Sequence, residues 1–160
     1  MGNIVLSFNW RSFIKWILIS LLSFIVLVIL FFQLFGFYRV YGDSMEPALK
    51  HGQMVMSLKW DQAPDVGDII LFHHGQNIFI KRVVALSGST VEAKNQKLYI
   101  NGKQAEEKYL AMKQPVQDFG PIKVPDGSVF VLGDEREGSY DSREMGPISK
   151  ERIKGVLIAY

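Results

Sequence analysis

The run WILISLLSFIVLVILFFQLFGFY, from Trp16 to Tyr38, decides how this chain is organised. No Asp, Glu, Lys, Arg or His interrupts it. A helix needs about 20 apolar residues to cross a hydrocarbon core of roughly 30 Å, so the run is long enough to span a membrane. It predicts a transmembrane helix over residues 16–38, between a short segment 1–15 and a separate domain at 39–160.

Two other interpretations of this run fit less well. A cleavable signal peptide has an apolar region of roughly 7–15 residues and ends at a small-x-small site. This run is longer, and Phe35–Arg39 offers no such site. A buried core helix would need apolar surroundings on all sides, which a chain of 160 residues cannot supply. An uncleaved membrane anchor is therefore expected.

The charges that flank the anchor predict its orientation. Arg11 and Lys15 precede it, and no acidic residue does. Basic residues beside a span tend to stay cytoplasmic. The sequence thus predicts a single-pass protein of the cell membrane, with residues 1–15 in the cytoplasm and residues 39–160 on the outer face.

The composition of the outer part excludes several functions. All but two of the 18 basic residues and all 16 acidic residues follow the anchor, so the formal charge there is balanced. Nucleic-acid binding would demand a basic surface, and no such partner is expected. The absence of cysteine excludes disulfides, thiolate metal sites and a cysteine nucleophile.

Short apolar runs separated by Gly, Pro and Asp turns follow the anchor, a pattern typical of β structure. Asn101–Gly102 predicts a hairpin turn. Residues 103–125 are the least regular part, with Glu106–Met112 as a candidate short helix. We expect one all-β domain of coiled or sandwiched antiparallel sheets. Its candidate strands are Phe37–Tyr41, Met54–Leu58, Asp68–Phe72, Ile78–Leu86, Thr90–Ala93, Lys97–Ile100, Ser128–Leu132 and Gly155–Ala159.

A possible nucleophile lies just after the anchor, in the segment YGDSMEPAL, Tyr41–Leu49. Taken alone, it is better explained as a turn capping a short helix that Pro47 would start. Ser44 becomes a nucleophile only if a nearby base can accept its proton. The histidines His51, His73 and His74 lie in polar loops where exposure is expected, and nothing in the sequence specifies a Ser-His-Asp arrangement.

Lys81 is the other candidate base, because it lies inside the apolar β run NIFIKRVVAL, Asn77–Leu86. A buried ammonium loses hydration, so its pKa falls and the neutral amine can accept a proton. The alternative is an edge-strand charge that discourages aggregation. Strand alternation predicts one face with Phe79, Lys81, Val83 and Ala85, and another with Ile78, Ile80, Arg82 and Val84.

A dense polar loop, GDEREGSYDSREMGPI at Gly133–Ile148, follows the apolar run Val129–Leu132. A solvated loop with ion pairs is the default interpretation. Its carboxylates fit no EF-hand spacing and have no companion histidine, so no metal and no other cofactor is expected.

Together these segments resemble the bacterial type I signal peptidases, membrane serine proteases with a Ser-Lys dyad. The family's box Ser-Met-x-Pro-Thr-Leu appears as Ser44–Leu49, departing at Ala48, and Gly-Asp-Ile-Val appears as Gly67–Ile70. Lys-Arg-Val-x-Gly-x-Pro-Gly matches Lys81–Gly88, with Ala85 and Ser87 departing. Gly-Asp-Asn-Arg-x-x-Ser-x-Asp-Ser-Arg-x-x-Gly matches Gly133–Gly146, with Glu135 in the Asn place. The resemblance covers residues 37–160 and implies the β fold shared with SOS-repressor proteases.

The resemblance also implies a role for each matching residue. Ser44 would attack the scissile carbonyl, and Lys81 would take its proton and later return one to the leaving amine. Ser139 would hydrogen-bond the Lys81 amine. Asp141 and Arg143 would form an ion pair behind it, and Asp134 would help to set the same loop.

The Ser44 backbone N–H would meet the oxyanion. Some family members carry a hydroxyl residue two positions before the nucleophile as a second donor, but here that position is Gly42. Glu135 would raise the pKa of Lys81 if it pointed inward; we expect it to point outward.

The implied substrates are secreted preproteins with signal peptides, cut after small residues of the Ala-x-Ala type. The lipid bilayer and the protein export machinery would be further partners. The residues implied to line the substrate pockets are Val40, Gly42, Met45, Leu49, Phe79 and Ile80. A peptidase dedicated to one substrate cluster remains open. A non-enzymatic chaperone of the same fold would be expected to lack Ser44 or Lys81, and a self-cleaving SOS repressor would carry a DNA-binding domain instead of the anchor.

Overall fold

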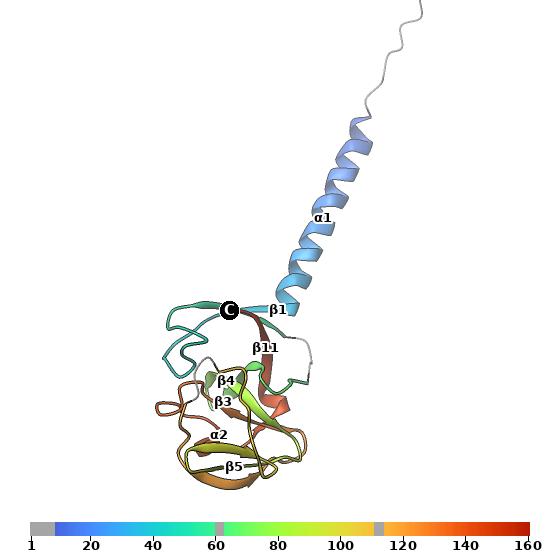
Figure 1. The fold of residues 1–160 in the computed structure, drawn as a ribbon. Helices are drawn as coiled ribbons and strands as arrows, with labels where there is room; N and C mark the ends of the chain where they lie inside the picture. Colours follow the sequence, from blue (N-terminus) through green and yellow to red (C-terminus); the bar gives the residue numbers. More distant parts are fainter. Residues whose placement is uncertain (1–8, 60–62, 111–113) are drawn as a thin grey trace, which may run out of the picture. The chain divides into compact units, whose positions relative to one another are not determined.

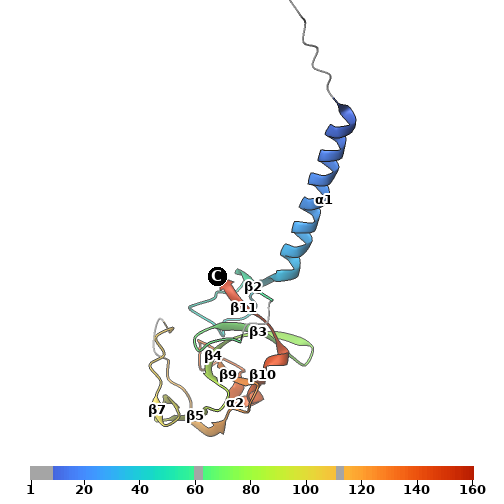
Figure 2. The ribbon, with the colours of Figure 1, turned by 90° about the vertical axis from the view of Figure 1, so that its right-hand side faces the viewer.

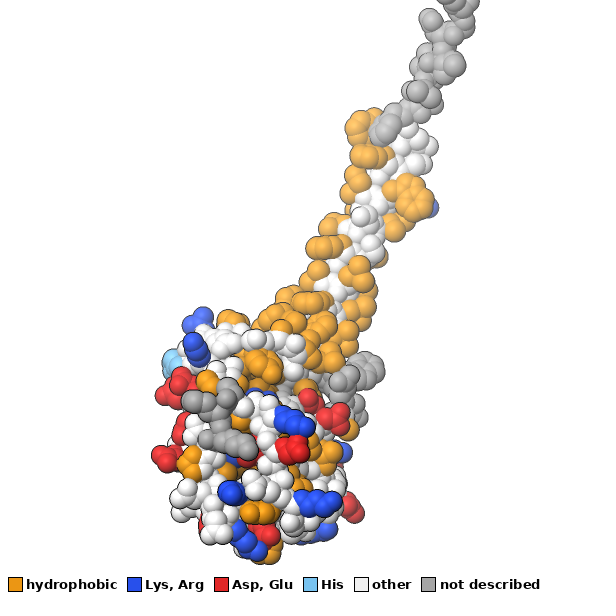
Figure 3. Space-filling model, viewed as in Figure 1, with side chains coloured by type: hydrophobic (Ala, Val, Ile, Leu, Met, Phe, Trp, Pro, Cys, Tyr) orange, Lys and Arg blue, Asp and Glu red, His pale blue; other side chains and the backbone are white. Residues whose placement is uncertain are grey.

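The structure, a computed structural model, describes residues 9–59, 63–110 and 114–160. The chain divides after Leu34 into an N-terminal unit and a β domain, Phe35–Tyr160. The helix α1, Trp10–Leu34, buries none of its residues and is long and apolar enough to cross a membrane. Figure 3 shows hydrophobic side chains along the visible face of this helix and mixed charges over the visible face of the domain.

A seven-stranded antiparallel sheet forms the larger layer of the domain, in the order β1-β2-β11-β3-β4-β9-β10. Figure 1 labels four of these strands, β1, β11, β3 and β4. The last strand of the chain, β11, lies between β2 and β3, so chain ends that are far apart in sequence share one sheet. The strands are β1 Phe35–Arg39, β2 Met54–Leu58, β3 Ile69–His74, β4 Asn77–Leu86, β9 Ser128–Leu132, β10 Ile148–Ser149 and β11 Ile153–Ala159.

A smaller antiparallel sheet has the order β7-β6-β5-β8. The short helix α2, Ser142–Met145, lies beside β9, which also pairs with β10 (Figure 2). A 3-10 turn, Lys150–Arg152, leads into β11. The strands of the smaller sheet are β5 Thr90–Lys94, β6 Lys97–Ile100, β7 Lys103–Gln104 and β8 Phe119–Lys123.

Alternate apolar side chains of β4 and β9 build the core on both faces of the larger sheet. One cluster joins Val84 and Phe130 to Val91 of the smaller sheet, and another joins Val83 to Val131. Burying this apolar surface is the main stabilising contribution to the domain. The predicted fold class, an all-β antiparallel domain after one apolar helix, is confirmed.

The helix ends earlier than the apolar run predicts. It stops at Leu34 rather than Tyr38, and Phe35 pairs with Leu58 as the first residue of β1. Apolar residues alone do not distinguish a helix from a buried strand. Gly36 suits the pairing of β1 with β2, because a Cβ at this position would lie 2.6 Å from a Tyr38 ring carbon and 3.0 Å from Ser57 Oγ.

Alternation along β4 is also interrupted. The register with β9 shifts between Val83 and Ala85, and Ala85 joins the cluster that contains Val84 rather than the one that contains Val83. The predicted placement of Ala85 on the Lys81 face is therefore wrong. A β-bulge inserts one extra residue, which reverses the facing of the residues that follow.

The irregular stretch after Lys103 differs from the expected short helix. Glu106–Leu110 contains a turn in which Leu110 N donates to Glu107 O at 3.0 Å, and Glu107 has a positive φ of 44°. The remainder of the predicted Glu106–Met112 helix lies outside the described residues. Strand β8 was not predicted, since Gly120 and Pro121 disfavour a strand; it is tolerated because β8 is an edge strand.

Candidate active site

The loop between β1 and β2 carries Ser44. Glu46 N donates to Asp43 O at 2.9 Å, and Leu49 N donates to Met45 O at 2.9 Å, so the segment is a series of turns rather than the helix expected at Pro47. Met45 and Leu49 are buried in the core beside Leu71. These two apolar anchors hold the loop against the sheet and leave the Ser44 side chain partly exposed.

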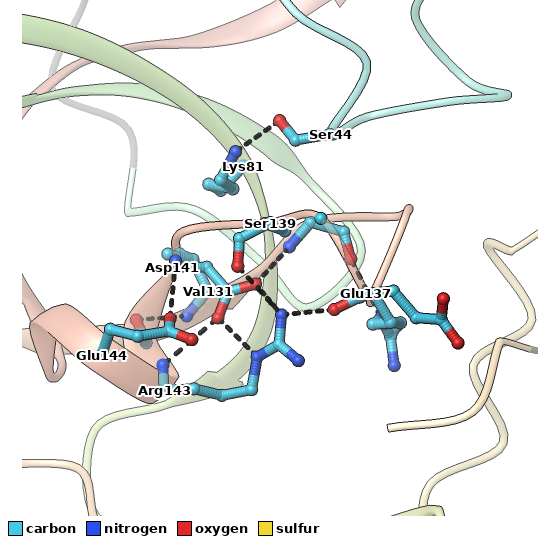
Figure 4. Close-up of polar contacts among 12 residues, drawn as sticks. Ser44, Lys81, Val131, Glu137, Ser139, Asp141, Arg143 and Glu144 are labelled. Atoms are coloured by element: carbon cyan, nitrogen blue, oxygen red, sulfur yellow. Dashed lines mark hydrogen bonds and ion pairs between the residues drawn. The ribbon is translucent and has the colours of Figure 1, made fainter. Parts of the chain in front are cut away.

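Lys81 lies at the middle of β4, which is flanked by β3 and β9 in the larger sheet. Although β9 pairs with β4 only from Arg82 onward, Lys81 is buried, so its interpretation as an exposed edge-strand charge is wrong. Its side chain is 3% exposed, and its Nζ atom lies 2.6 Å from Ser44 Oγ (Figure 4). The fold thus brings together a hydroxyl and an amine that are 37 positions apart in the sequence.

Burial lowers the pKa of Lys81 from 10.5 to about 8. The loss of hydration outweighs the negative charges of Asp141 and Asp134, which raise the pKa, while the positive charge of Arg143 lowers it further. At pH 7 about a tenth of such amines are neutral, against about 0.03% for a lysine that titrates at 10.5. The amine beside Ser44 is therefore able to act as a base near neutral pH.

Asp141 organises the loop that follows β9. It caps α2 by accepting from Arg143 N at 3.2 Å, it accepts from Gly133 N at 2.9 Å, and Glu144 completes the capping box. Arg143 Nε lies 2.8 Å from Asp141 Oδ1, so the structure contains the ion pair that was expected between these residues. Figure 4 shows this network below the Ser44 and Lys81 side chains.

Ser139 does not make the expected hydrogen bond to Lys81. Its Oγ is buried and has no hydrogen-bond partner among the described residues. The hydroxyl lies against Gly133, where an added Cβ would also come within 2.6 Å of the Ser44 carbonyl oxygen. Gly133 is therefore the point at which the nucleophile loop and the Ser139 segment meet, and only glycine fits there.

Asp134 was expected to help set its own loop, and in the structure it forms an ion pair with Arg82, the neighbour of Lys81. Arg82 Nε and a terminal nitrogen of the same guanidinium lie 2.7 and 2.6 Å from the two carboxylate oxygens. The two side chains are only 4% and 1% exposed. Arg82 also donates to Gly67 O at 2.6 Å, which joins the Gly67–Ile70 segment to the site. Sequence reasoning missed this pair, although two opposite charges next to apolar strands were a signal for it.

Two further loop residues have structural roles. Arg136 is buried, donates to Gly133 O at 2.9 Å and pairs with Glu107 at 2.5 Å, which fastens the irregular stretch to the loop. Glu135 accepts from the backbone N–H groups of Glu137 and Gly138 at 3.2 and 2.6 Å. These two bonds turn the Glu135 carboxylate toward the Glu137–Gly138 backbone.

A cleft of about 720 Å³ opens above Ser44 and Lys81. Leu49 is wholly buried and does not line it. Tyr140, which sequence reasoning missed, lines the cleft and packs against Phe79 with ring centroids 6.0 Å apart. The other residues proposed for the substrate pockets all line it: Val40, Gly42, Met45, Phe79 and Ile80.

The three histidines lie outside the Ser44–Lys81 contact. His51 Nδ1 accepts from Gly42 N, and His74 Nδ1 lies 2.5 Å from an Arg152 nitrogen. His73 is exposed. Among the described residues, no histidine is hydrogen-bonded to Ser44 or to Lys81.

Comparison with known proteins shows which class of enzyme the chain belongs to. Residues 11–160 match the family described as signal peptidase, peptidase S26. The chain is thus a serine peptidase, a hydrolase in which a β-sheet domain follows an apolar helix in the sequence. It is 36% identical over 159 residues to signal peptidase I S of Bacillus subtilis, covering 91% of this chain and 86% of that protein.

Two further similar proteins are also signal peptidases I. Signal peptidase I of Bacillus amyloliquefaciens is 36% identical over 155 residues, covering 89% of this chain and 84% of the relative. A crystal structure of a signal peptidase I from Enterococcus faecalis is 37% identical, with a TM-score of 0.53, covering 61% of this chain and 98% of that one. The chain belongs to the signal peptidase I family, which confirms the resemblance found in the sequence.

Proposed function

We propose that this protein removes signal peptides from exported preproteins, with Ser44 as nucleophile and Lys81 as general base. The observation that carries the proposal is the 2.6 Å contact between Lys81 Nζ and Ser44 Oγ. A serine hydroxyl is a weak nucleophile until an adjacent base accepts its proton. Burial of the amine, with its pKa lowered to about 8, supplies such a base.

The chemistry proceeds in two halves. Ser44 Oγ attacks the scissile carbonyl carbon while its proton moves to Lys81 Nζ. The tetrahedral intermediate then breaks its C–N bond, Lys81 returns the proton to the leaving amine, and an ester to Ser44 remains. Water, deprotonated by the neutral Lys81, attacks the ester carbon. The C–O bond to Ser44 then breaks, Lys81 returns the proton to Ser44 Oγ, and the signal peptide leaves with its new carboxyl end.

The backbone N–H of Ser44 is proposed to stabilise the oxyanion of each intermediate. Among the described residues, this N–H donates to no other group, so it is available. Gly42 N–H is not available as the second donor, because it is bound to His51 Nδ1 at 3.0 Å. Ser139 Oγ, buried without a partner, is proposed to accept a hydrogen bond from the Lys81 ammonium once the Ser44 proton has moved.

The cleft is suited to an extended peptide. Strand β9 pairs with β4 only from Arg82 to Leu86, which leaves one edge of Asn77–Lys81 unpaired beside the cleft. Strand β1 lies at the end of the larger sheet and also has a free edge. A substrate can add main-chain hydrogen bonds along such edges while pockets select its side chains. Val40, Gly42, Met45, Phe79 and Ile80 are proposed to line those pockets, which favours small residues before the scissile bond.

Cleavage of a model preprotein by the full chain in detergent micelles tests this function. We expect one cut after an Ala-x-Ala sequence, located by mass spectrometry of both products. Replacing the last of these alanines by phenylalanine is expected to lower kcat/KM by at least about tenfold, since even one methylene too many costs about 1–3 kcal/mol in a fitted pocket. Cuts scattered through the mature part, or indifference to this replacement, would rule out the proposed specificity.

The lipid bilayer and the export machinery are proposed as further partners. We propose that α1 anchors the chain in the cell membrane, with its N-terminal flank in the cytoplasm and the β domain outside. Arg11 and Lys15, in the first turns of α1, support this orientation. A cleavage site emerging at the membrane surface would then lie near Ser44, which follows the helix by ten positions.

Protease treatment of intact spheroplasts checks this orientation. The β domain is expected to be digested while an epitope added before residue 9 stays protected. If the β domain stayed intact under conditions that digest a known outer-face protein, the proposed orientation would be wrong.

A further inference from the structure

The loop that carries Ser44 is closed by an unusual contact. Gly42 N–H donates a hydrogen bond to His51 Nδ1 at 3.0 Å, across nine positions of the chain. The Tyr41 ring meets the His51 ring edge-on, with centroids 5.9 Å apart. Gly42 lies two residues before Ser44 and lines the cleft, so the contact fixes the backbone at the entrance to the nucleophile turn.

Other parts of the loop are held independently of His51. Its base is closed by Val40 N to Gln53 O and Gly52 N to Val40 O, both at 2.9 Å. Its far side is fixed by the burial of Met45 and Leu49 in the core. Tyr41 and Gly42 connect Val40 to the turn at Asp43. Within the described part of the chain, the bond from Gly42 N to His51 is the one hydrogen bond that these two residues make.

Gly42 needs such a tether. Its φ of 87° is in the left-handed region, which glycine adopts readily, and a Cβ there would touch nothing within 4 Å. No atom lies where a side chain of this residue would be, and glycine has more backbone freedom to lose than any other residue. Ser44 O accepts from Glu135 N at 3.2 Å, which holds the C-terminal side of Ser44, so movement at Gly42 would act on its N–H side.

We propose that His51 is a positioning residue, whose Nδ1 holds Gly42 and thereby orients Ser44 toward Lys81 and the substrate. The proposal rests on the proposed role of Ser44 as nucleophile. Because Nδ1 accepts a hydrogen bond, the neutral ring carries its proton on Nε2. This positioning role requires a hydrogen-bond acceptor at position 51, not a base. It therefore differs from the hypothesis that a histidine deprotonates Ser44, which the geometry of the site disfavours.

Substitutions at His51 test whether the residue acts as a hydrogen-bond acceptor or only fills space in the loop. His51→Asn keeps an acceptor oxygen at a position close to that of Nδ1, whereas His51→Ala removes it. His73→Ala is the matched control, since His73 is another exposed histidine whose side chain makes no hydrogen bond in the described chain. All variants are assayed as the full chain in detergent micelles on the same model preprotein.

We expect His51→Ala to lower kcat about tenfold and to change KM less than about twofold, because misplacing a nucleophile weakens only the transition state. His51→Asn should recover to within about threefold of the wild type, and His73→Ala should equal it. Unchanged kcat in His51→Ala, or His51→Asn as slow as His51→Ala, would overturn the proposal.

An activity-free measurement distinguishes this proposal from the proposed function. In the Ser44→Ala background, the Gly42 amide is expected to exchange with solvent about tenfold more slowly than in the Ser44→Ala/His51→Ala double variant, as followed by NMR. Equal exchange overturns the tether even if Ser44→Ala abolishes cleavage. Full cleavage by Ser44→Ala overturns the proposed function instead, and with it the catalytic consequence assigned to His51.

Discussion

Ser44→Ala and Lys81→Ala are each expected to lower kcat/KM by about three orders of magnitude or more, with the fold intact. The two groups act as a unit across a 2.6 Å contact, so losing either leaves no activated nucleophile. Preprotein cleavage measures the loss, and circular dichroism of the same samples confirms folding. Lys97→Ala, which removes an exposed strand lysine, is the control and should retain wild-type activity.

Near-normal turnover by Lys81→Ala would contradict the dyad. The search for a base would then return to His51, His73 and His74. Loss of activity in Ser44→Ala accompanied by a loss of β-sheet signal would instead indicate unfolding, which the partial exposure of Ser44 makes unexpected.

Asp134→Ala is expected to destabilise the protein by about 3–5 kcal/mol, because it leaves the buried Arg82 guanidinium without its counter-ion. For a domain of this size the melting temperature should fall by about 10–20 °C. Thermal unfolding of the full chain in micelles, followed by circular dichroism, measures the change. Lys94→Ala removes an exposed lysine from its ion pair with the half-buried Glu92 and should shift the melting temperature by at most a few degrees.

The double variant Arg82→Met/Asp134→Leu distinguishes the effect of an unpaired buried charge on the melting temperature from the effect of lost packing. Replacing both partners by apolar groups removes the uncompensated charge, so this variant should melt higher than Asp134→Ala alone. A melting temperature for Asp134→Ala within about 2 °C of the wild type would show that the pair does not stabilise the fold.

Much of the fold was predictable from local pattern. The bounds of Met54–Leu58, Lys97–Ile100 and Ser128–Leu132 agree with the structure, because each apolar run is short and ends at turn residues. The hairpin turn at Asn101–Gly102 also agrees, and Asn101 has the positive φ of 52° that such turns need. The N-terminal end of β1 was not predictable, since its apolar residues continue the composition of the helix.

The placement of Lys81 shows what a sequence reveals about a site. A lysine among Phe79, Ile80 and Val83 indicated burial, and the structure shows Lys81 buried with its amine against Ser44. The pairing of Arg82 with Asp134, 52 positions away, depends on strand order, which no local pattern specifies. The Gly42–His51 contact depends on the path of a loop, so His51 looked like any other exposed histidine.

The dependence of kcat/KM on pH tests most directly the central claim, that Lys81 is a general base whose pKa is lowered by burial. Since burial lowers its pKa to about 8, the neutral fraction increases as pH rises through that value, and the rate should increase with it. Lys81→Arg should be inactive at every pH, because a guanidinium stays charged. The account predicts a rising limb centred near pH 8 for the wild type. A limb centred near 10.5, or appreciable cleavage by Lys81→Arg, would contradict it.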